Sequence, residues 1–189
     1  MRIITDDIGA VVAAMRPIDS SYGQPMVDYI ASKNTPANVS LMPYYLPGHR
    51  MEINKILLEK EQDKIYKYQK YPLIALRLDI PEEVDEYGFV TYNLNIVILT
   101  LTDKNYTYEQ RKTNIFVPVL IPLYERFIDE LVNAGLFNWD GDKRRPPHTR
   151  ILRPFWGTES REGNEKYIFS DPLDAIEIVG LELKSSKNC

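Results

Sequence analysis

The sequence TYNLNIVILTLTD, which runs from Thr91 to Asp103, predicts the central strand of a small sheet. Its first residues alternate between polar and apolar, as in a strand with one buried and one exposed face. One face is apolar throughout, and its residues are Tyr92, Leu94, Ile96 and Ile98. The other face begins with polar Thr91, Asn93 and Asn95 and then turns apolar at Val97, Leu99 and Leu101. The far end of this strand is therefore expected to be buried on both faces.

The second apolar face, formed by Val97, Leu99 and Leu101, needs a cover because adjacent exposed apolar side chains are unfavourable in water. The cover is either this chain's own first helix or proline-rich segment, or the matching element of a neighbouring subunit. These three residues are therefore candidates for a contact between chains.

Further regular elements are predicted before this strand. An amphipathic helix near the N-terminus has its apolar residues at helical spacing, and they are Ile4, Ile8, Val11, Val12 and Met15. A second helix is predicted at His49–Tyr68 and a strand at Tyr71–Ile80. The acidic turn Pro81–Gly88 joins that strand to Phe89–Leu101, which predicts an antiparallel hairpin.

A long helix and a final strand are predicted after the central strand. Thr107 and Gln110 have the spacing of a capping box, and Gly135 is the expected stop of the helix. A kink or break is expected near Pro118. The apolar stripe of the helix is Phe116, Leu120, Leu123, Phe127 and Leu131. In the last strand, Leu173–Lys184, a bulge at Gly180 would place Leu181 and Leu183 on the same face as Ile176 and Ile178. Glu177 would then face solvent.

Two long irregular segments complete the chain. Residues 17–47 contain five prolines, which disfavour a regular central strand, and they predict either an irregular surface segment or an extended arm along another subunit. Residues 138–172 predict a long interaction loop with a short strand at Thr149–Phe155. We interpret residues 1–189 as one α+β domain. It has a small, mainly antiparallel sheet with helices packed on one face, plus the long arm and loop.

The composition excludes several classes of protein. The net charge of −4 does not favour a nucleic-acid reader, which normally has a basic face. No apolar run reaches the roughly 18 residues that a membrane-spanning helix needs, so no membrane partner is expected. The single cysteine, Cys189, cannot form a disulfide within the chain.

The sequence contains no recognisable catalytic, cofactor-binding or metal-binding pattern. Its two histidines, His49 and His148, have no Cys, His or carboxylate partner at metal-ligand spacing, which favours structural or surface roles. No glycine-rich phosphate loop and no nucleophile motif is present. We therefore expect no cofactor and no enzymatic activity. An enzyme whose site is assembled from distant carboxylates and arginines is the least favoured alternative.

Aromatic and basic residues in the irregular segments indicate protein contacts instead. Tyrosine, tryptophan and arginine are enriched at protein–protein interfaces. The only basic concentration includes Arg144, Arg145, Arg150 and Arg153, close to Trp156 in the sequence. Together with the apolar strand end, the predicted contacts between chains are Val97, Leu99, Leu101, Tyr44, Tyr45, Arg144, Arg145, Arg153 and Trp156. The alternative is that the aromatic residues only pin their own loops to the body of the protein.

The order of several segments resembles the neck and tail-completion proteins of tailed bacteriophages, a group that includes tail terminators and head–tail connector ring proteins. The segments that carry the resemblance are Tyr71–Ile74, Thr100–Asp103, Tyr106–Arg111, Pro122–Tyr124 and Asp174–Ile178. The similarity covers about Glu52–Lys184. The arm and the long loop depart from small members of this family, which leaves the kind of ring open.

This resemblance implies a structural virion protein, assembled in the host cytoplasm, that forms a ring of about six or twelve copies in the neck or tail. Its expected partners are other copies of itself, the portal or adjacent neck proteins, and tail proteins. Double-stranded DNA would pass through the lumen without sequence recognition. The acidic residues Glu82, Glu83, Asp85 and Glu86 are then expected near the lumen or a basic neighbour. The alternative function is a non-viral protein–protein binding module.

Overall fold

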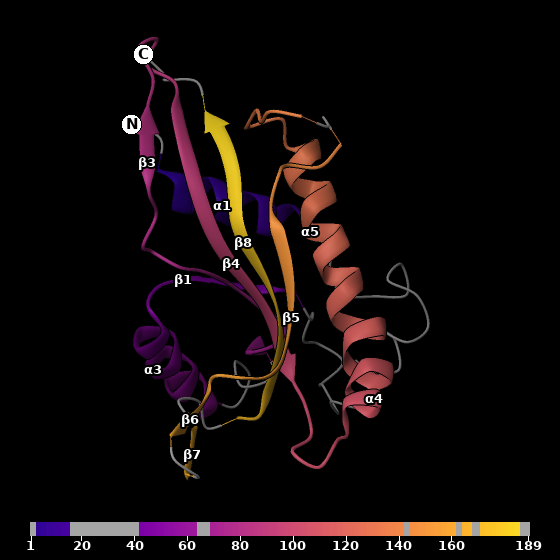
Figure 1. The fold of residues 1–189 in the computed structure, drawn as a ribbon. Helices are drawn as coiled ribbons and strands as arrows, with labels where there is room; N and C mark the ends of the chain where they lie inside the picture. The colour runs from indigo at the N-terminus through magenta and orange to yellow at the C-terminus, as the bar shows by residue number, and fades with distance from the viewer. Residues whose placement is uncertain are drawn as a thin grey trace.

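The computed structural model describes residues 3–15, 42–63, 69–141, 144–161, 164–167 and 171–185, and it confirms the α+β fold. Figure 1 shows a twisted sheet with helices around it. The helical elements are α1 (Ile4–Ala14), α3 (Arg50–Glu61), α4 (Tyr108–Arg111), a π-helical segment (Lys112–Leu120) and α5 (Ile121–Asn133). The strands are β1 (Tyr44–Pro47), β2 (Leu73–Leu76), β3 (Glu82–Val84), β4 (Val90–Leu101), β5 (Thr149–Trp156), β6 (Thr158–Arg161), β7 (Asn164–Tyr167) and β8 (Leu173–Ser185).

Strand β4 lies at the centre of the sheet, as predicted for Thr91–Asp103. The strand order is β1-β2-β4-β8-β5, and β3 pairs with β4 beside β2. All pairs are antiparallel except β1 with β2, so the sheet is mainly antiparallel. Strands β6 and β7 form a separate hairpin. No helix among the described residues has both the length and the apolar character needed to cross a membrane.

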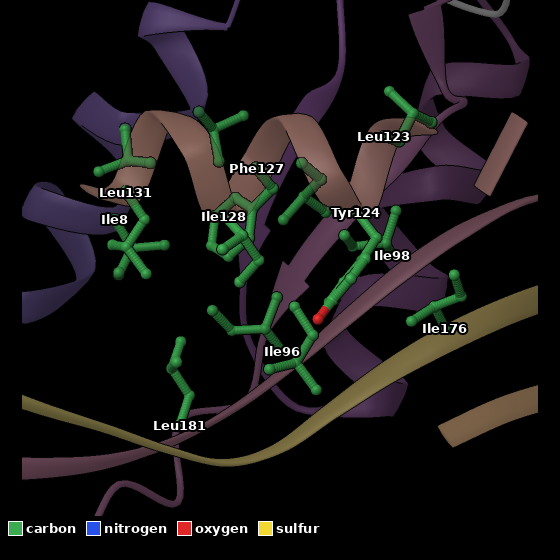
Figure 2. Close-up of a cluster of buried hydrophobic side chains, with 14 of the residues drawn as sticks. Ile8, Ile96, Ile98, Leu123, Tyr124, Phe127, Ile128, Leu131, Ile176 and Leu181 are labelled. Carbon is green, nitrogen blue, oxygen red and sulfur yellow. The ribbon is translucent and has the colours of Figure 1, made fainter. Parts of the chain in front are cut away.

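One face of the sheet packs against α1, the π-helical segment and α5. Figure 2 shows Phe127 and Ile128 of α5 pointing toward Ile96 of β4. Every predicted apolar residue of α1 is buried here, because the helical spacing places all five on one side. The predicted apolar stripe is buried as well, and it runs from Phe116 of the π-helical segment to Leu131 of α5.

Helix α3 covers the opposite face of the sheet, which corrects the prediction that the helices pack on one face only. Ile53 and Leu57 of α3 and Leu46 of β1 belong to a second core cluster, together with Val97 and Leu99. Because alternate residues of a strand point to opposite faces, Ile96 and Ile98 join the first core while Val97 and Leu99 join the second. The end of β4 is therefore buried on both faces, as predicted, and residues of this same chain cover both faces.

The predicted helix cap, helix stop, helix irregularity and strand bulge are all confirmed. The Thr107 hydroxyl accepts a hydrogen bond from the Gln110 amide, and the Gln110 side chain accepts one from the Thr107 amide. Gly135 has a φ of 61° and follows the end of α5. The nine-residue π-helical segment contains Pro118, at the predicted irregularity. The register shifts between Leu94 and Ile96, opposite Gly180, whose φ is 67°.

Several predicted boundaries are wrong. Helix α3 ends at Glu61 rather than Tyr68, and residues 64–68 lie outside the described part of the chain. The strand predicted at Tyr71–Ile80 is limited to β2, since Arg77–Asp79 are exposed. The loop 138–172 contains β6 and β7 as well as β5, and β5 confirms the strand predicted at Thr149–Phe155 to within one residue. The arm 17–47 ends in β1, and residues 17–41 are not described. Edge strands such as β1 and β5 form through backbone pairing, which leaves little alternation in the side chains.

Tyr45 of β1 gives a testable pH dependence. Its hydroxyl donates a hydrogen bond to the Thr5 carbonyl of α1 at 2.8 Å. Burial, and secondarily the charge of Asp6, raise the pKa of Tyr45 above its ordinary value of 10.0. Because the pKa is higher in the folded state, the neutral Tyr45 hydroxyl contributes its full stabilisation at pH values below the unfolded-state pKa. This contribution is lost as the pH rises above about 10. Between pH 9 and about 11, the unfolding free energy of Tyr45→Phe should therefore fall by less than that of the wild type. Urea titrations at each pH would measure this difference.

The matched control for Tyr45→Phe is Tyr87→Phe, because Tyr87 is strongly exposed. We expect its unfolding free energy to follow the pH dependence of the wild type. Equal pH slopes for Tyr45→Phe and the wild type would contradict the assigned role of the Tyr45 hydroxyl.

Candidate functional site

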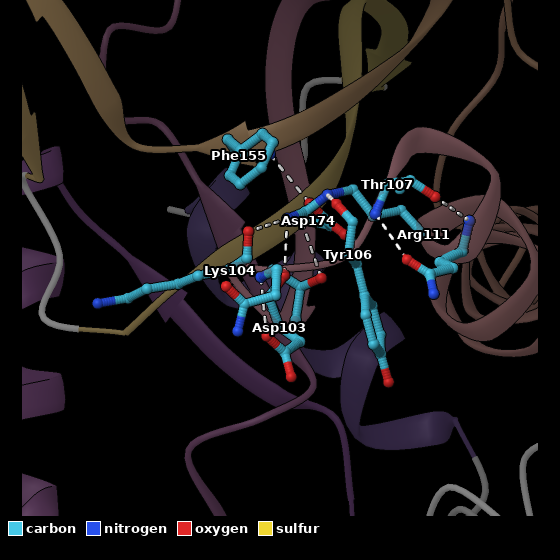
Figure 3. A network of polar contacts seen from close by, with 10 residues as sticks. Asp103, Lys104, Tyr106, Thr107, Arg111, Phe155 and Asp174 are labelled. Atoms are coloured by element: carbon cyan, nitrogen blue, oxygen red, sulfur yellow. Dashed lines mark hydrogen bonds and ion pairs between the residues drawn. The ribbon is translucent and has the colours of Figure 1, made fainter.

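A buried ion pair, Arg111 with Asp174, joins the helical layer to the sheet (Figure 3). Arg111 is the last residue of α4 and Asp174 is the second residue of β8, and their side chains are 1% and 0% exposed. The Arg111 Nη1 atom lies 2.7 Å from Asp174 Oδ1. Charged residues are almost never fully buried unless they are paired, so each of these two side chains needs the other in order to remain in the interior.

The Arg111 guanidinium is engaged on every nitrogen. Nη1 also donates to the Thr102 hydroxyl at 2.9 Å, and Nε donates to the Tyr106 carbonyl at 3.1 Å. Nη2 donates to the Asp103 carbonyl at 2.6 Å, and the guanidinium carbon lies 3.5 Å from the centre of the Phe155 ring. These contacts fasten the end of β4, the start of the helix and the end of β5 together. A guanidinium saturated in this way serves the fold rather than a substrate.

Asp174 holds the irregular end of β5 as well. Its Oδ1 atom accepts a second hydrogen bond, from the Phe155 amide at 2.9 Å. Phe155 has a φ of 54°, a left-handed conformation that non-glycine residues seldom adopt, and the register of β5 against β8 shifts between Arg153 and Trp156. Sequence reasoning missed this pair. The available signal was that Asp174 shares a strand face with Ile176 and Ile178, where a carboxylate needs a buried partner.

A second buried cation, Lys70, also has a structural role. Its Nζ atom contacts Glu61 at the end of α3 and lies 2.8 Å from Asp171, which precedes β8. The Tyr71 hydroxyl donates to the same Asp171 oxygen at 3.0 Å. Burial alone would lower the pKa of Lys70, but the hydrogen bonds to Asp171 and Glu61 raise it.

His148 lies beside α5 in a hydrogen-bonded position. Its Nδ1 atom is 2.7 Å from the Pro146 carbonyl, which can only accept, so Nδ1 carries the proton in the neutral ring. Its Nε2 atom then accepts from the Tyr124 hydroxyl at 2.7 Å. Burial raises the pKa of Tyr124. This geometry agrees with a structural role for His148.

Three residues predicted to contact another chain are buried within this one. Val97 and Leu99 are covered by α3 and β1, so the prediction that they contact a neighbour is wrong. Trp156 is only 7% exposed and packs in the same core, which corrects its assignment too. Its indole nitrogen donates to Glu177 at 2.9 Å, and Arg153 Nε donates to Glu177 at 2.8 Å. Glu177 is therefore not the solvent-facing residue that was predicted.

Three other predicted contact residues remain partly accessible. Leu101 is half-buried at the edge of the second core. Tyr44 is half-buried under Lys60, whose Nζ atom lies 3.9 Å from the centre of the tyrosine ring. Tyr45 is also half-buried, against α1. Their contact with another chain stays a prediction.

Side chains alternate between the two faces of the sheet along β5, so the predicted group of basic residues is split between those faces. Arg150 lies on the α5 side of the sheet, where its Nη1 atom is 3.6 Å from Glu125 Oε1, and Arg145 also contacts Glu125. Arg144 is exposed next to Arg145. We call Arg144, Arg145 and Arg150 the arginine cluster. Arg153 points to the other face of the sheet, because an odd number of positions separates it from Arg150.

The acidic residues lie on a projecting hairpin. The prediction of a turn over Pro81–Gly88 is wrong for Glu82 and Glu83, which belong to strand β3 because this segment pairs with Val90–Tyr92. Asp85 closes the turn, since its Oδ1 atom accepts hydrogen bonds from the amides of Tyr87 at 2.9 Å and Phe89 at 2.8 Å. We call Glu82–Phe89 the acidic hairpin.

Large apolar side chains are exposed on the acidic hairpin. The exposed fractions are 65% for Val84, 78% for Tyr87 and 43% for Phe89. All four acidic residues are exposed beside them, and none forms an ion pair within the described part of the chain. Apolar side chains gathered at an exposed tip are typical of a surface that meets another molecule.

Charged side chains line one of the surface hollows in the described part of the chain. One hollow of about 210 Å³ is lined by Gly48, His49, Arg50, Arg77 and Asp79. Its two arginines have partners, because Arg77 donates to Asp79 at 3.2 Å and Arg50 lies over the Trp156 ring. Among the described residues, no group of three or more His, Cys, Asp or Glu side chains could hold a metal ion.

Comparison of the chain with protein-family models, curated proteins and solved structures gives no match. The surface that best fits a contact with another molecule is the acidic hairpin, because its acidic and large apolar side chains are exposed together.

Proposed function

We propose that this protein is a structural ring subunit of the neck or tail of a tailed bacteriophage, through which double-stranded DNA passes. The observation that carries the proposal is the acidic hairpin, where Val84, Tyr87 and Phe89 are exposed on a turn held by Asp85. An exposed tip of this kind suits a subunit that is covered by neighbours after assembly. The family resemblance of the sequence supports a virion location, as a tail terminator or a connector ring.

The charged groups of the interior support a mechanical rather than a chemical role. Arg111, Asp174 and Lys70 are each engaged in contacts that join one element to another. In a ring that transmits force or guides DNA, such contacts would keep the subunit in one shape. A subunit with an acidic surface would also let DNA pass, because contacts between cations and phosphates are what retain it.

The second candidate is a protein–protein binding module outside any virion, since the exposed hairpin would equally suit a single partner protein. The neighbouring genes discriminate between the two, because a ring subunit is expected beside portal, terminase and capsid genes. Genes of another kind at that position would favour the binding module.

The assembly state tests the proposed function. We expect the purified protein to sediment as a closed ring of about six or twelve copies, alone or after addition of portal or tail proteins from the same genome. Negative-stain images would show its central opening. A protein that stays monomeric and also fails to co-sediment with those portal and tail proteins would contradict the proposal.

A further inference from the structure

We infer that the π-helical segment, Lys112–Leu120, is a conformational device that sets the rotation of α5 about its own axis. The segment winds about half a turn less than an α-helix with the same number of residues. This difference lets the Arg111 side chain and the apolar residues of α5 face the sheet together. The role of the segment is independent of the proposed function, because it concerns how one chain packs its own helix.

The backbone hydrogen bonds show that the winding changes within this helix. The Lys112 amide donates to the Tyr108 carbonyl, four residues earlier, as in an α-helix. The Ile121 amide donates to the Phe116 carbonyl, which is five residues earlier. Bonds to the fifth residue define a π-helix, which is rare and occurs mostly as single turns. A π-helical segment of nine residues therefore needs a physical reason.

The buried positions of the segment follow the wider winding. Arg111, the residue before the segment, is 1% exposed. In an α-helix, the positions three and seven residues after Arg111 would share its face, but Asn114 is exposed and Pro118 is only half-buried. A π-helix has about one residue more per turn, so the shared positions become four, five, eight and nine residues later. These positions are the buried ones, namely Ile115, Phe116, Val119 and Leu120.

Two fixed contacts determine the rotation that the segment must supply. Arg111 Nη1 lies 2.7 Å from Asp174 on β8, and Figure 2 shows Phe127 of α5 pointing toward Ile96 of β4. The nine steps from Arg111 to Leu120 make about two and a half turns in an α-helix, which would place Leu120 opposite Arg111. In a π-helix they make about two full turns, so Leu120 returns to the side of Arg111. The buried residues of α5 then follow Leu120 at α-helical spacing, and they are Leu123, Tyr124, Phe127, Ile128 and Leu131.

A wholly α-helical segment of this length could bury Arg111 or the apolar residues of α5, but not both. Two full α-helical turns take about seven residues, so the nine-residue segment contains about two residues more than two turns need. Pro118 accounts for the place of the widening, because in an α-helix its ring would clash with the Asn114 carbonyl. The π-helical winding therefore absorbs two residues without turning α5 away from the sheet.

Removing two residues from the segment tests this role. The reference variant carries Pro118→Ala and Pro122→Ala, so that an uninterrupted α-helix can form. The deletion variant carries the same substitutions and lacks Thr113 and Asn114, whose side chains are exposed. We expect its melting temperature, measured by circular dichroism, to lie within about 4 °C of the reference, because two α-helical turns keep the rotation of α5. Adding Arg111→Met should lower the melting temperature equally in both variants, since Arg111 still reaches Asp174.

The matched control removes two residues from the regular helix α5 in the same reference variant. It lacks Glu125 and Arg126, neither of which is buried. This deletion turns the rest of α5 by about half a turn, so the apolar residues on one side of the deletion leave the sheet. We expect its melting temperature to fall by more than about 10 °C. The inference would be overturned by a Thr113–Asn114 deletion that melts as low as this control, or in which Arg111→Met loses its effect. A control that melts with the reference would overturn it as well.

Discussion

Replacing Arg111 with Met is expected to lower the free energy of unfolding by about 3–5 kcal/mol, because the buried Asp174 carboxylate would lose its charged partner. The carbonyls of Asp103 and Tyr106 would lose their donors as well. For a chain of this size, the melting temperature would fall on the order of 10 °C. Chemical and thermal unfolding followed by circular dichroism would measure both changes.

The control for Arg111→Met is Arg77→Met, which breaks the exposed pair between Arg77 and Asp79. Exposed pairs contribute about 0–1 kcal/mol, so this change should be small. The double variant Arg111→Met/Asp174→Leu should cost less than the sum of the two single variants, because no buried charge is left unpaired. Equal losses for Arg111→Met and Arg77→Met would show that the buried pair does not hold the helix to the sheet.

Replacing Leu57 with Ala is expected to lower the free energy of unfolding by about 2–5 kcal/mol, because it opens a cavity in the second core. Leu57 is 3% exposed and lies on α3, in the core that covers Val97 and Leu99. Its neighbour Leu58 is 43% exposed, so Leu58→Ala is a control of identical chemistry. The control should cost less than about 0.5 kcal/mol.

The loss in Leu57→Ala should not depend on protein concentration. A face covered by the same chain is protected in every monomer, whereas a face covered by a neighbouring subunit would be protected only after association. Urea unfolding at two protein concentrations, differing by about fiftyfold, would distinguish the two cases. A midpoint that shifts with concentration more in Leu57→Ala than in the wild type would contradict the assignment of α3 as the cover.

Elements with a strong periodic pattern could be predicted from the sequence. Burial of one face imposes a period of two on a strand and of 3.6 on a helix, and both periods are local properties. For this reason β4, the bulge at Gly180 and the stripe on α5 are where the sequence placed them. The capping box at Thr107 was equally readable, because its two hydrogen bonds join residues three positions apart.

Contacts between distant segments could not be predicted in the same way. Arg111 and Asp174 are 63 positions apart, and neither residue's neighbours identify the other as its partner. The edge strand β5 was predicted to within one residue, as Thr149–Phe155, but its pairing with β8 was not, because most of its side chains are exposed and show little alternation. The acidic and basic residues were likewise visible as two charged segments, but the pairing of β3 with β4 and the place of β5 at the edge of the sheet follow only from the tertiary structure.

The amino-acid sequence by itself determined that β4 would be dry on both faces at its far end, because Val97, Leu99 and Leu101 are apolar wherever the chain places them. Only the tertiary structure decided what covers that face. The cover comes from α3, β1 and Trp156, which are distant in sequence and meet over β4 because each has an apolar side to bury. Apolar burial is non-directional, so the pattern of β4 specifies that a partner is needed and leaves its identity to the packing of the whole chain.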